Sequence, residues 1–126
     1  MKLRTGVDVV EISRIERLIQ QYDKRFLNRI YTPKELTQVG TNLASLSARF
    51  AAKEATAKAL GTGIGPVGWQ DIEILSSAKK EPVLHLLGAA KRLADEQHLT
   101  IWSLSLSHTH TYAIAFVVAM SREEES

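Results

Sequence analysis

Two carboxylates lie at positions where a negative charge without a partner would be costly. Asp8 lies in the valine-rich segment TGVDVV, which predicts a strand over residues 5–10, and aspartate is disfavoured inside strands. Glu54 lies in a periodic stretch that predicts a helix over residues 43–60, packed on all sides. Carboxylates from two such elements could share Mg²⁺, which prefers a few oxygen ligands together with water and substrate phosphates. Two simpler explanations stay open, a strand-end hydrogen bond for Asp8 and an i,i+4 ion pair of Glu54 with Lys58.

A second group of polar side chains suits a phosphate. The connection between two apolar segments holds side chains that can all donate hydrogen bonds, namely His108 and His110 beside Ser107, Thr109 and Thr111. A histidine at a loop tip can equally be solvated without a ligand. The glycine-rich segment GTGIG, residues 61–65, would let the backbone approach a phosphate, although it matches no nucleotide-binding motif. Residue types alone therefore indicate a phosphate-and-metal site and go no further.

Periodicity and turn signals predict the elements that carry these residues. One amphipathic helix is expected over residues 12–30, and its polar face is strongly basic. Thr32-Pro33-Lys34-Glu35 has the form of a helix start with a capping box, and Gly61 is placed to end the helix of residues 43–60. The remaining predictions are strands at residues 71–76 and 82–87, a helix at 88–97, a hairpin formed by IWSLSLS and TYAIAFVVAM around His-Thr-His, and a frayed acidic tail, SREEES.

Composition limits the classes of protein. The 126 residues, 44% hydrophobic and 24% charged, suit one folded domain over residues 1–126. A net charge of +2 favours anionic partners without selecting nucleic acid. The absence of cysteine excludes disulfides and thiol nucleophiles, and no apolar run approaches the roughly 20 residues of a membrane span. Acidic residues follow the start too soon for a signal peptide, so a cytoplasmic protein is expected.

Four segments, taken in order, carry a family resemblance. GVDVVEISRIE, YTPKEL, ARFAAKEATAKALGTGIG and SLSHTHTYAIAFVVA resemble the holo-acyl-carrier-protein synthases of the 4′-phosphopantetheinyl transferase family. The match spans nearly the whole chain, and the pattern RFAxKEAxxKAxGTG, here residues 49–63, is highly specific to that family. The chain departs from it in reading Lys80-Glu81-Pro82 for the usual Gly-Lys-Pro, and Ser47-Ala48 for Ala-Gly.

The resemblance implies a fold and an activity. The fold would be α+β, with a mainly antiparallel sheet packed against a long central helix, assembled as a homotrimer with sites at the subunit interfaces. The activity would be Mg²⁺-dependent transfer of 4′-phosphopantetheine from coenzyme A to a serine of apo acyl carrier protein, in fatty acid biosynthesis. The second product would be adenosine 3′,5′-bisphosphate.

The resemblance also implies roles for single residues. Asp8 and Glu54 would bind Mg²⁺, and Lys58 would contact the diphosphate or the leaving group. The base that takes the serine proton would be Glu54 or a metal-bound water near it or near Asp8, and this choice stays open. The residues expected around coenzyme A are Arg49, Ser107, His108 and Thr109 at the 3′-phosphate, and Gly61, Gly63, Gly65 and Pro82 at the nucleotide.

The basic face of the first helix predicts where a protein partner docks. Arg14, Arg17 and Arg25 would meet the acidic surface of the carrier protein. One rival function is a non-catalytic anion-binding module, for example for RNA, but basic and aromatic residues are not interleaved as such binding requires. Another is a relative that modifies peptide or polyketide synthase carriers, which usually has two such halves in one chain. Neither nucleic acid nor a membrane is expected as a partner.

Overall fold

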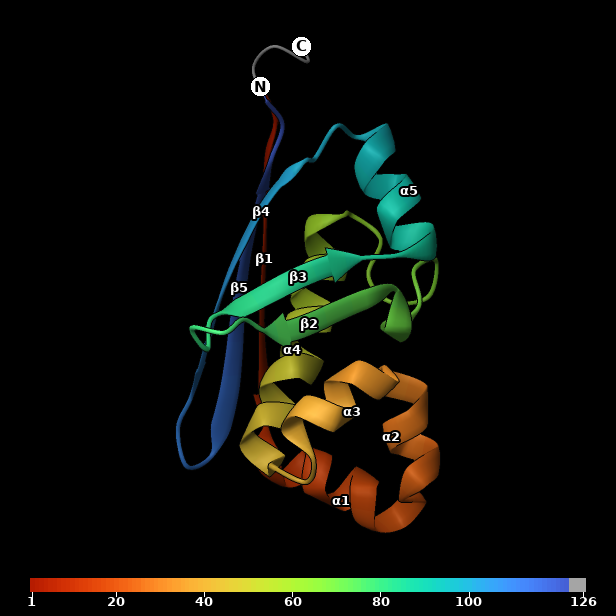
Figure 1. Cartoon of the computed structure of the whole chain (residues 1–126), viewed down its shortest axis with the longest axis vertical. Coiled ribbons are helices and arrows are strands. Elements are labelled where there is room, and N and C mark those ends of the chain that lie inside the picture. The colour runs from red at the N-terminus through yellow and green to blue at the C-terminus, as the bar shows by residue number, and fades with distance from the viewer. Residues whose placement is uncertain (123–126) are drawn as a thin grey trace.

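The computed structural model describes residues 1–122 and shows an α+β fold. Residues 123–126 of the predicted acidic tail lie outside the described residues. In chain order the elements are β1 (Leu3–Glu11), α1 (Ile12–Tyr22), α2 (Lys24–Ile30), α3 (Pro33–Val39), α4 (Leu43–Ala59), the 3₁₀ turn η1 (Trp69–Asp71), β2 (Ile72–Ser76), β3 (Pro82–Leu86), α5 (Gly88–Glu96), β4 (Ile101–His108) and β5 (Tyr112–Met120) (Figure 1).

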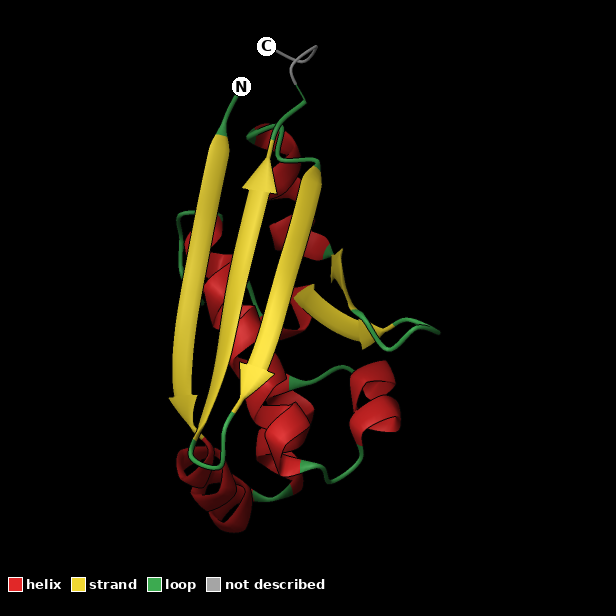
Figure 2. Cartoon of the chain, turned by 90° about the vertical axis from the view of Figure 1, so that its left-hand side faces the viewer, coloured by secondary structure: helices red, strands yellow, loops and turns green. Residues whose placement is uncertain are grey.

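Both sheets are antiparallel. The larger has the order β1-β5-β4 and the smaller pairs β2 with β3. Because side chains alternate along a strand, one face of β5 buries Ala113, Ala115, Val117 and Ala119 against α4. The opposite face of the three strands is covered by no other described element and lies open toward the viewer in Figure 2.

Small residues let α4 lie close to the larger sheet. The helix contributes Ala51, Ala52, Ala55 and Ala59 to the core. A Cβ atom added to Gly6 of β1 would lie 1.9 Å from the carbonyl oxygen of Ala55. Glycine at this position therefore permits the contact that brings β1 and α4 together.

The predicted helix ends are confirmed at α3 and α4. Thr32 and Glu35 form the capping box of α3. Gly61 follows α4 with a φ of 90°, a conformation that favours glycine. The last carbonyl groups of α4 accept hydrogen bonds from Arg4 Nε, at Ala59, and from Gln97 Nε2, at Leu60.

The prediction of one helix over residues 12–30 is wrong, because the chain turns at Asp23. This residue has φ 48° and ψ −125°, which ends α1 and begins α2 in a new direction. Aspartate tolerates a positive φ better than most residues. The turn brings Phe26 of α2 to Phe50 of α4, with ring centroids 6.2 Å apart. The turn at Asp23 between α1 and α2 thus allows Phe26 to be buried against the core.

The last described residues are held against the N-terminus. The predicted fraying from residue 121 onward is wrong for Ser121, whose hydroxyl accepts a 2.8 Å hydrogen bond from Lys2 N while its own N–H donates to Lys2 O.

Within residues 1–122, no helix has both the length and the apolar character that crossing a membrane requires.

A fully buried ion pair ties α4 to three other elements. Lys53 Nζ lies 2.8 Å from Glu35 Oε1 and also donates to the carbonyl groups of Trp69 and Ile72. Glu35 Oε2 accepts a hydrogen bond from Ile74 N. Because both charges have several partners, their burial is tolerated. The network fixes α3, η1 and β2 against the helix that carries Glu54.

Candidate active site

Asp8 projects from β1 toward α4. In the register of the larger sheet it faces Ala115, whose side chain is buried under α4, whereas its neighbours Val7 and Val9 point to the opposite, open face. Lys58 Nζ of α4 lies 2.9 Å from Asp8 Oδ1 and 3.1 Å from the carbonyl oxygen of Val7. The seam between β1 and α4 thus holds a carboxylate and a lysine.

Glu54 lies one helical turn before Lys58 and shares this seam. Burial raises the pKa of the Glu54 carboxyl, and the neighbouring Asp8 raises it further. Arg14 and Lys58 act in the opposite direction and lower it. Among the described residues Lys58 pairs with Asp8, and the simpler alternative of a Glu54–Lys58 ion pair is not formed. The two predicted carboxylates are therefore neighbours.

Asp8 and Glu54 suit Mg²⁺ better than they suit a metal ion that takes all of its ligands from the protein. Residues 1–122 contain no cluster of three or more His, Asp or Glu side chains arranged to hold a metal. Two carboxylates leave most of an octahedral shell to water and to phosphate oxygens, which is the usual situation for Mg²⁺. A cation here would also relieve the repulsion that raises the pKa of Glu54.

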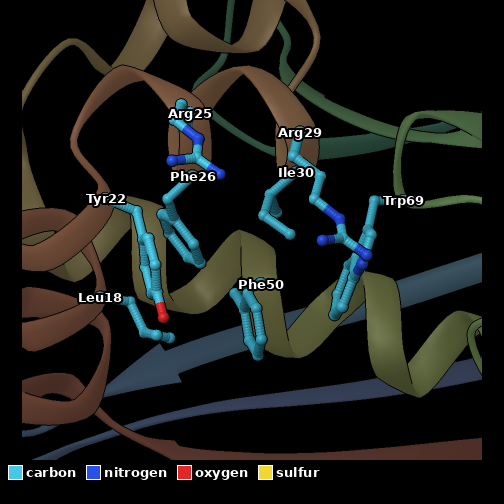
Figure 3. A pocket seen from close by; sticks show the side chains of 8 residues that line it. All are labelled: Leu18, Tyr22, Arg25, Phe26, Arg29, Ile30, Phe50 and Trp69. Atoms are coloured by element: carbon cyan, nitrogen blue, oxygen red, sulfur yellow. The ribbon is translucent and has the colours of Figure 1, made fainter.

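A cleft of about 500 Å³ opens beside this seam, between α2 and α4. Its floor is apolar and its rim is basic, with Arg25 and Arg29 projecting from α2 (Figure 3). The lining comprises Leu18, Tyr22, Arg25, Phe26, Arg29, Ile30, Phe50 and Trp69. The guanidinium carbon of Arg14 lies 5.6 Å from the centre of the Phe50 ring. Of the three predicted docking arginines, Arg25 lines the cleft and Arg14 lies over the ring of Phe50, whereas Arg17 is exposed and does not line the cleft.

Arg49 lies on a different side of α4. Its Nε donates to the carbonyl oxygen of Ile74 and its Nη2 to Ser76 Oγ, both at 3.1 Å. Burial lowers its pKa, while Glu35 acts in the opposite direction. The register of the smaller sheet places Pro82 opposite Ser76, so Arg49 and Pro82 flank the same residue.

The segment Ser107–Thr109 lies at the far end of β4. His108 is the last residue of this strand, so the predicted connection is shifted by one residue and comprises 109–111. The Thr109 hydroxyl accepts hydrogen bonds from the N–H groups of Thr111 and Tyr112 and so stabilises the turn. Ser107 and His108 are exposed, and neither lines the hollow that contains Arg49. Within one chain these residues are not joined with Arg49 in one pocket.

The glycine loop follows α4 directly. Gly61, Gly63 and Gly65 all have positive φ, at 90°, 68° and 139°. A Cβ atom at Gly61 would lie 2.7 Å from Nη2 of Arg4, whereas Gly63 and Gly65 have open space around them. The loop is therefore built from conformations that only glycine adopts freely.

Sequence reasoning missed the aromatic floor of the cleft. Phe50 and Trp69 stack with ring centroids 4.7 Å apart. The periodicity of residues 43–60 puts Phe50 on the apolar side of its helix, but no local signal indicates that Trp69 joins it. Lys53 Nζ also donates a 3.0 Å hydrogen bond to the carbonyl oxygen of Trp69, so a second contact links α4 to residues 16 positions away in sequence.

The profile of the 4′-phosphopantetheinyl transferase superfamily matches residues 4–117. The chain belongs to this superfamily. Within it, the chain is 43% identical over 125 residues to a holo-[acyl-carrier-protein] synthase of Herpetosiphon aurantiacus, covering 94% of this chain and 98% of the relative. It is 46% identical over 119 residues to the synthase of Chlamydia felis, covering 91% and 94%. This transferase chain is therefore an enzyme of the holo-[acyl-carrier-protein] synthase type.

Solved structures of related transferases share the fold. The synthase of Helicobacter pylori in complex with coenzyme A superposes with a TM-score of 0.85 at 36% identity, covering 92% of this chain and 99% of that one. The synthase of Neisseria meningitidis gives a TM-score of 0.86 at 39% identity, covering 94% and 98%. The predicted α+β class with antiparallel sheets is confirmed.

Proposed function

We propose that this chain transfers 4′-phosphopantetheine from coenzyme A to a serine of apo acyl carrier protein, with Mg²⁺, in fatty acid biosynthesis. The observation that carries the proposal is the seam of Asp8, Glu54 and Lys58 in a chain of this superfamily. The Helicobacter pylori synthase has been solved in complex with coenzyme A, which supports the same donor here. Residues 1–126 would act as one domain, and the lack of cysteine suits the cytoplasm.

The residues of the seam have separate tasks in this reaction. Asp8 and Glu54 would hold Mg²⁺, which neutralises charge on the pyrophosphate when bound. Lys58, already fixed by Asp8 and the Val7 carbonyl group, would stabilise the charge that develops on the leaving group. The acceptor serine must lose a proton, and the base would be Glu54 or a metal-bound water near it or near Asp8.

The cleft beside the seam suits the carrier protein. Arg25 supplies positive charge at its rim and Arg14 lies over the Phe50 ring, while the rings of Phe26, Phe50 and Trp69 supply an apolar floor. An acidic helix with apolar side chains would meet both features, and charge would orient it as it approaches. Arg17 lies outside the cleft and would act only through its long-range field.

The open face of the larger sheet supports the homotrimer. Leu3, Val7, Val9, Ile101, Tyr112 and Phe116 are all more than a third exposed on this face. The Phe116 side chain is 45% exposed and lies beside Val7, its partner on β1. Exposed apolar side chains gathered on one face in this way mark a protein interface, and copies of this chain are the proposed occupants. Ser107 and His108 of one subunit would then complete a site whose metal ligands lie in the next.

The test is the release of adenosine 3′,5′-bisphosphate from coenzyme A, followed by chromatography while Mg²⁺ is titrated. Product should appear only with both metal and an apo carrier that retains its serine. Asp8→Asn and Glu54→Gln should each lower turnover at least about a hundredfold, because each removes a metal ligand. Glu96→Gln, at an exposed carboxylate on α5, is the matched control and should keep full turnover. Equal rates in all variants would remove the seam from the reaction.

A further inference from the structure

The 3₁₀ turn η1 contacts both walls of the cleft between α2 and α4. Trp69 is the first residue of this turn and stacks on Phe50 of α4, with ring centroids 4.7 Å apart. Lys53 of α4 donates a 3.0 Å hydrogen bond to the carbonyl oxygen of the same tryptophan. One side of η1 is thus fixed to α4, the helix that also carries Glu54.

Gln70 connects η1 to the other wall. Its Nε2 atom donates hydrogen bonds to the carbonyl oxygens of Asn28, in the last turn of α2, and of Tyr31, which follows this helix. The last carbonyl groups of a helix have no partner within the helix, so a side chain from outside can serve as their donor. A carboxamide nitrogen has two hydrogen atoms, and each of these bonds uses one of them. Both donors of the Gln70 side chain are therefore used within the protein.

The position of α2 matters because its side chains form the basic rim. Arg25 and Arg29 project from this helix over the cleft, and Arg29 lies at the same end of the cleft as Trp69 (Figure 3). The helix is only seven residues long and begins directly after the turn at Asp23. A helix this short is not stable on its own and depends on its contacts. The two hydrogen bonds from Gln70 hold its C-terminal end at a defined separation from α4.

Other hydrogen bonds keep η1 in place independently of Gln70. The Asp71 side chain accepts a 2.9 Å bond from Gly68 N, and the Asp71 carbonyl oxygen accepts a 2.8 Å bond from Leu87 N. Neither bond involves α2. Loss of the Gln70 amide should therefore leave the turn in place and release only the end of α2.

We propose that Gln70 is a positioning residue for the carrier protein, because it acts through α2 to place Arg25 and Arg29 above the aromatic floor of the cleft. The identity of the partner rests on the proposed function. Charge orients an acidic carrier as it approaches, so displaced arginines would weaken carrier binding. Coenzyme A binding should be unaffected, since both bonds of Gln70 go to the end of α2.

The experiment replaces the amide by an apolar side chain of similar length. Gln70 is exposed, so its substitution should not prevent folding. Gln70→Met should weaken the binding of apo carrier protein, measured by calorimetry, about fivefold, as expected for the loss of one or two hydrogen bonds at the surface. KM for coenzyme A, and kcat at saturating carrier, should stay at their wild-type values.

Gln97→Met is the matched control. Gln97 Nε2 also donates to a carbonyl oxygen at the end of a helix, that of Leu60 after α4, but it lies outside the cleft. The same chemical change at this site should leave carrier binding unchanged. Equal losses of carrier binding in the two variants would assign the effect to a general loss of structure and would overturn the inference.

A double-mutant cycle with Arg25→Ala tests whether Gln70 acts through α2. Arg25→Ala should weaken carrier binding less in Gln70→Met than in the wild type, because the displaced arginine contributes less there. Strictly additive effects of the two substitutions, or a wild type that binds no apo carrier, would overturn the inference.

Transfer is measured separately, by the release of adenosine 3′,5′-bisphosphate, so the two proposals can fail independently. Transfer with unchanged carrier binding in Gln70→Met refutes only the positioning role. Carrier binding that weakens in Gln70→Met but not in Gln97→Met, in a protein that releases no bisphosphate, supports the positioning role and refutes the proposed function.

Discussion

Asp8 and Glu54 are neighbouring carboxylates whose negative charges repel each other. Aspartate among valines and glutamate in a packed helix were both detectable in the sequence, since each is costly without a partner. Their meeting, and the bond from Lys58 to Asp8 instead of Glu54, were not predictable from local pattern. The register of β1 against α4 decides these contacts, and that register depends on packing across 50 residues of sequence.

The raised pKa of Glu54 predicts how stability depends on pH. The folded protein binds this proton more tightly than the unfolded chain, whose carboxyl has the ordinary pKa of 4.5. Without metal, the free energy of unfolding should therefore fall as pH rises from below 4.5 through the raised folded pKa. Glu54→Gln should remove this fall, and Mg²⁺ should offset it in the wild type.

Denaturant titrations over a pH series measure this effect. Glu96→Gln provides the control, because it removes an exposed carboxylate outside the seam. Superimposable pH profiles for the wild type and Glu54→Gln would show that Glu54 does not carry the effect.

The contact between β1 and α4 determines whether the seam exists. Gly6→Ala would push a Cβ atom against the carbonyl oxygen of Ala55, 1.9 Å away, and force the strand from the helix. We expect a loss of about 3 kcal/mol in stability, as for severe overpacking. Turnover should fall as well, because Asp8 lies two residues along the same strand.

Gly40→Ala is the control for this substitution. It has open space around its Cβ position and only a positive φ of 54° to oppose the change. Its cost should be about 1 kcal/mol, with turnover retained. Similar stability losses for both variants, with activity kept, would mean that the close approach at Gly6 is unimportant.

Most elements followed from local signals, and the exceptions explain the cleft. The capping box at Thr32 and the hairpin of β4 and β5 were predicted because their signals lie within a few residues. The break at Asp23 was not, since the apolar periodicity continues through it and only the packing of Phe26 on Phe50 favours the turn. The cleft between α2 and α4 results from that break, so the sequence did not predict the cleft either.

The cleft predicts unequal roles for two arginines of the basic face. Arg25→Glu should lower kcat/KM for the carrier about tenfold or more and weaken its salt dependence, because Arg25 lines the cleft. Arg17→Glu makes the same charge change outside the cleft and should have a much smaller effect. KM for coenzyme A should stay constant in both. Equal effects of the two variants would place carrier docking elsewhere.

At the scale of the molecule, the open face of the larger sheet predicts self-association. In the proposed homotrimer Phe116→Glu would bury a charge between subunits and should convert trimers to monomers, as measured by analytical ultracentrifugation. Leu87→Glu is matched in exposure, at 46% against 45%, but lies outside this sheet and should stay trimeric. A trimer that persists in Phe116→Glu would show that the subunits meet through another surface.

The intact mass of the carrier protein is the most direct measure of the proposed transfer. Apo acyl carrier protein is incubated with coenzyme A, Mg²⁺ and this enzyme, and its mass is then measured. We expect the carrier to gain the mass of one phosphopantetheine group. This gain should be absent when the acceptor serine is replaced by alanine, and nearly absent when Glu54→Gln replaces the wild-type enzyme. An unchanged carrier mass with the wild-type enzyme and Mg²⁺, under conditions in which a known synthase modifies the same carrier, would contradict the proposed transfer.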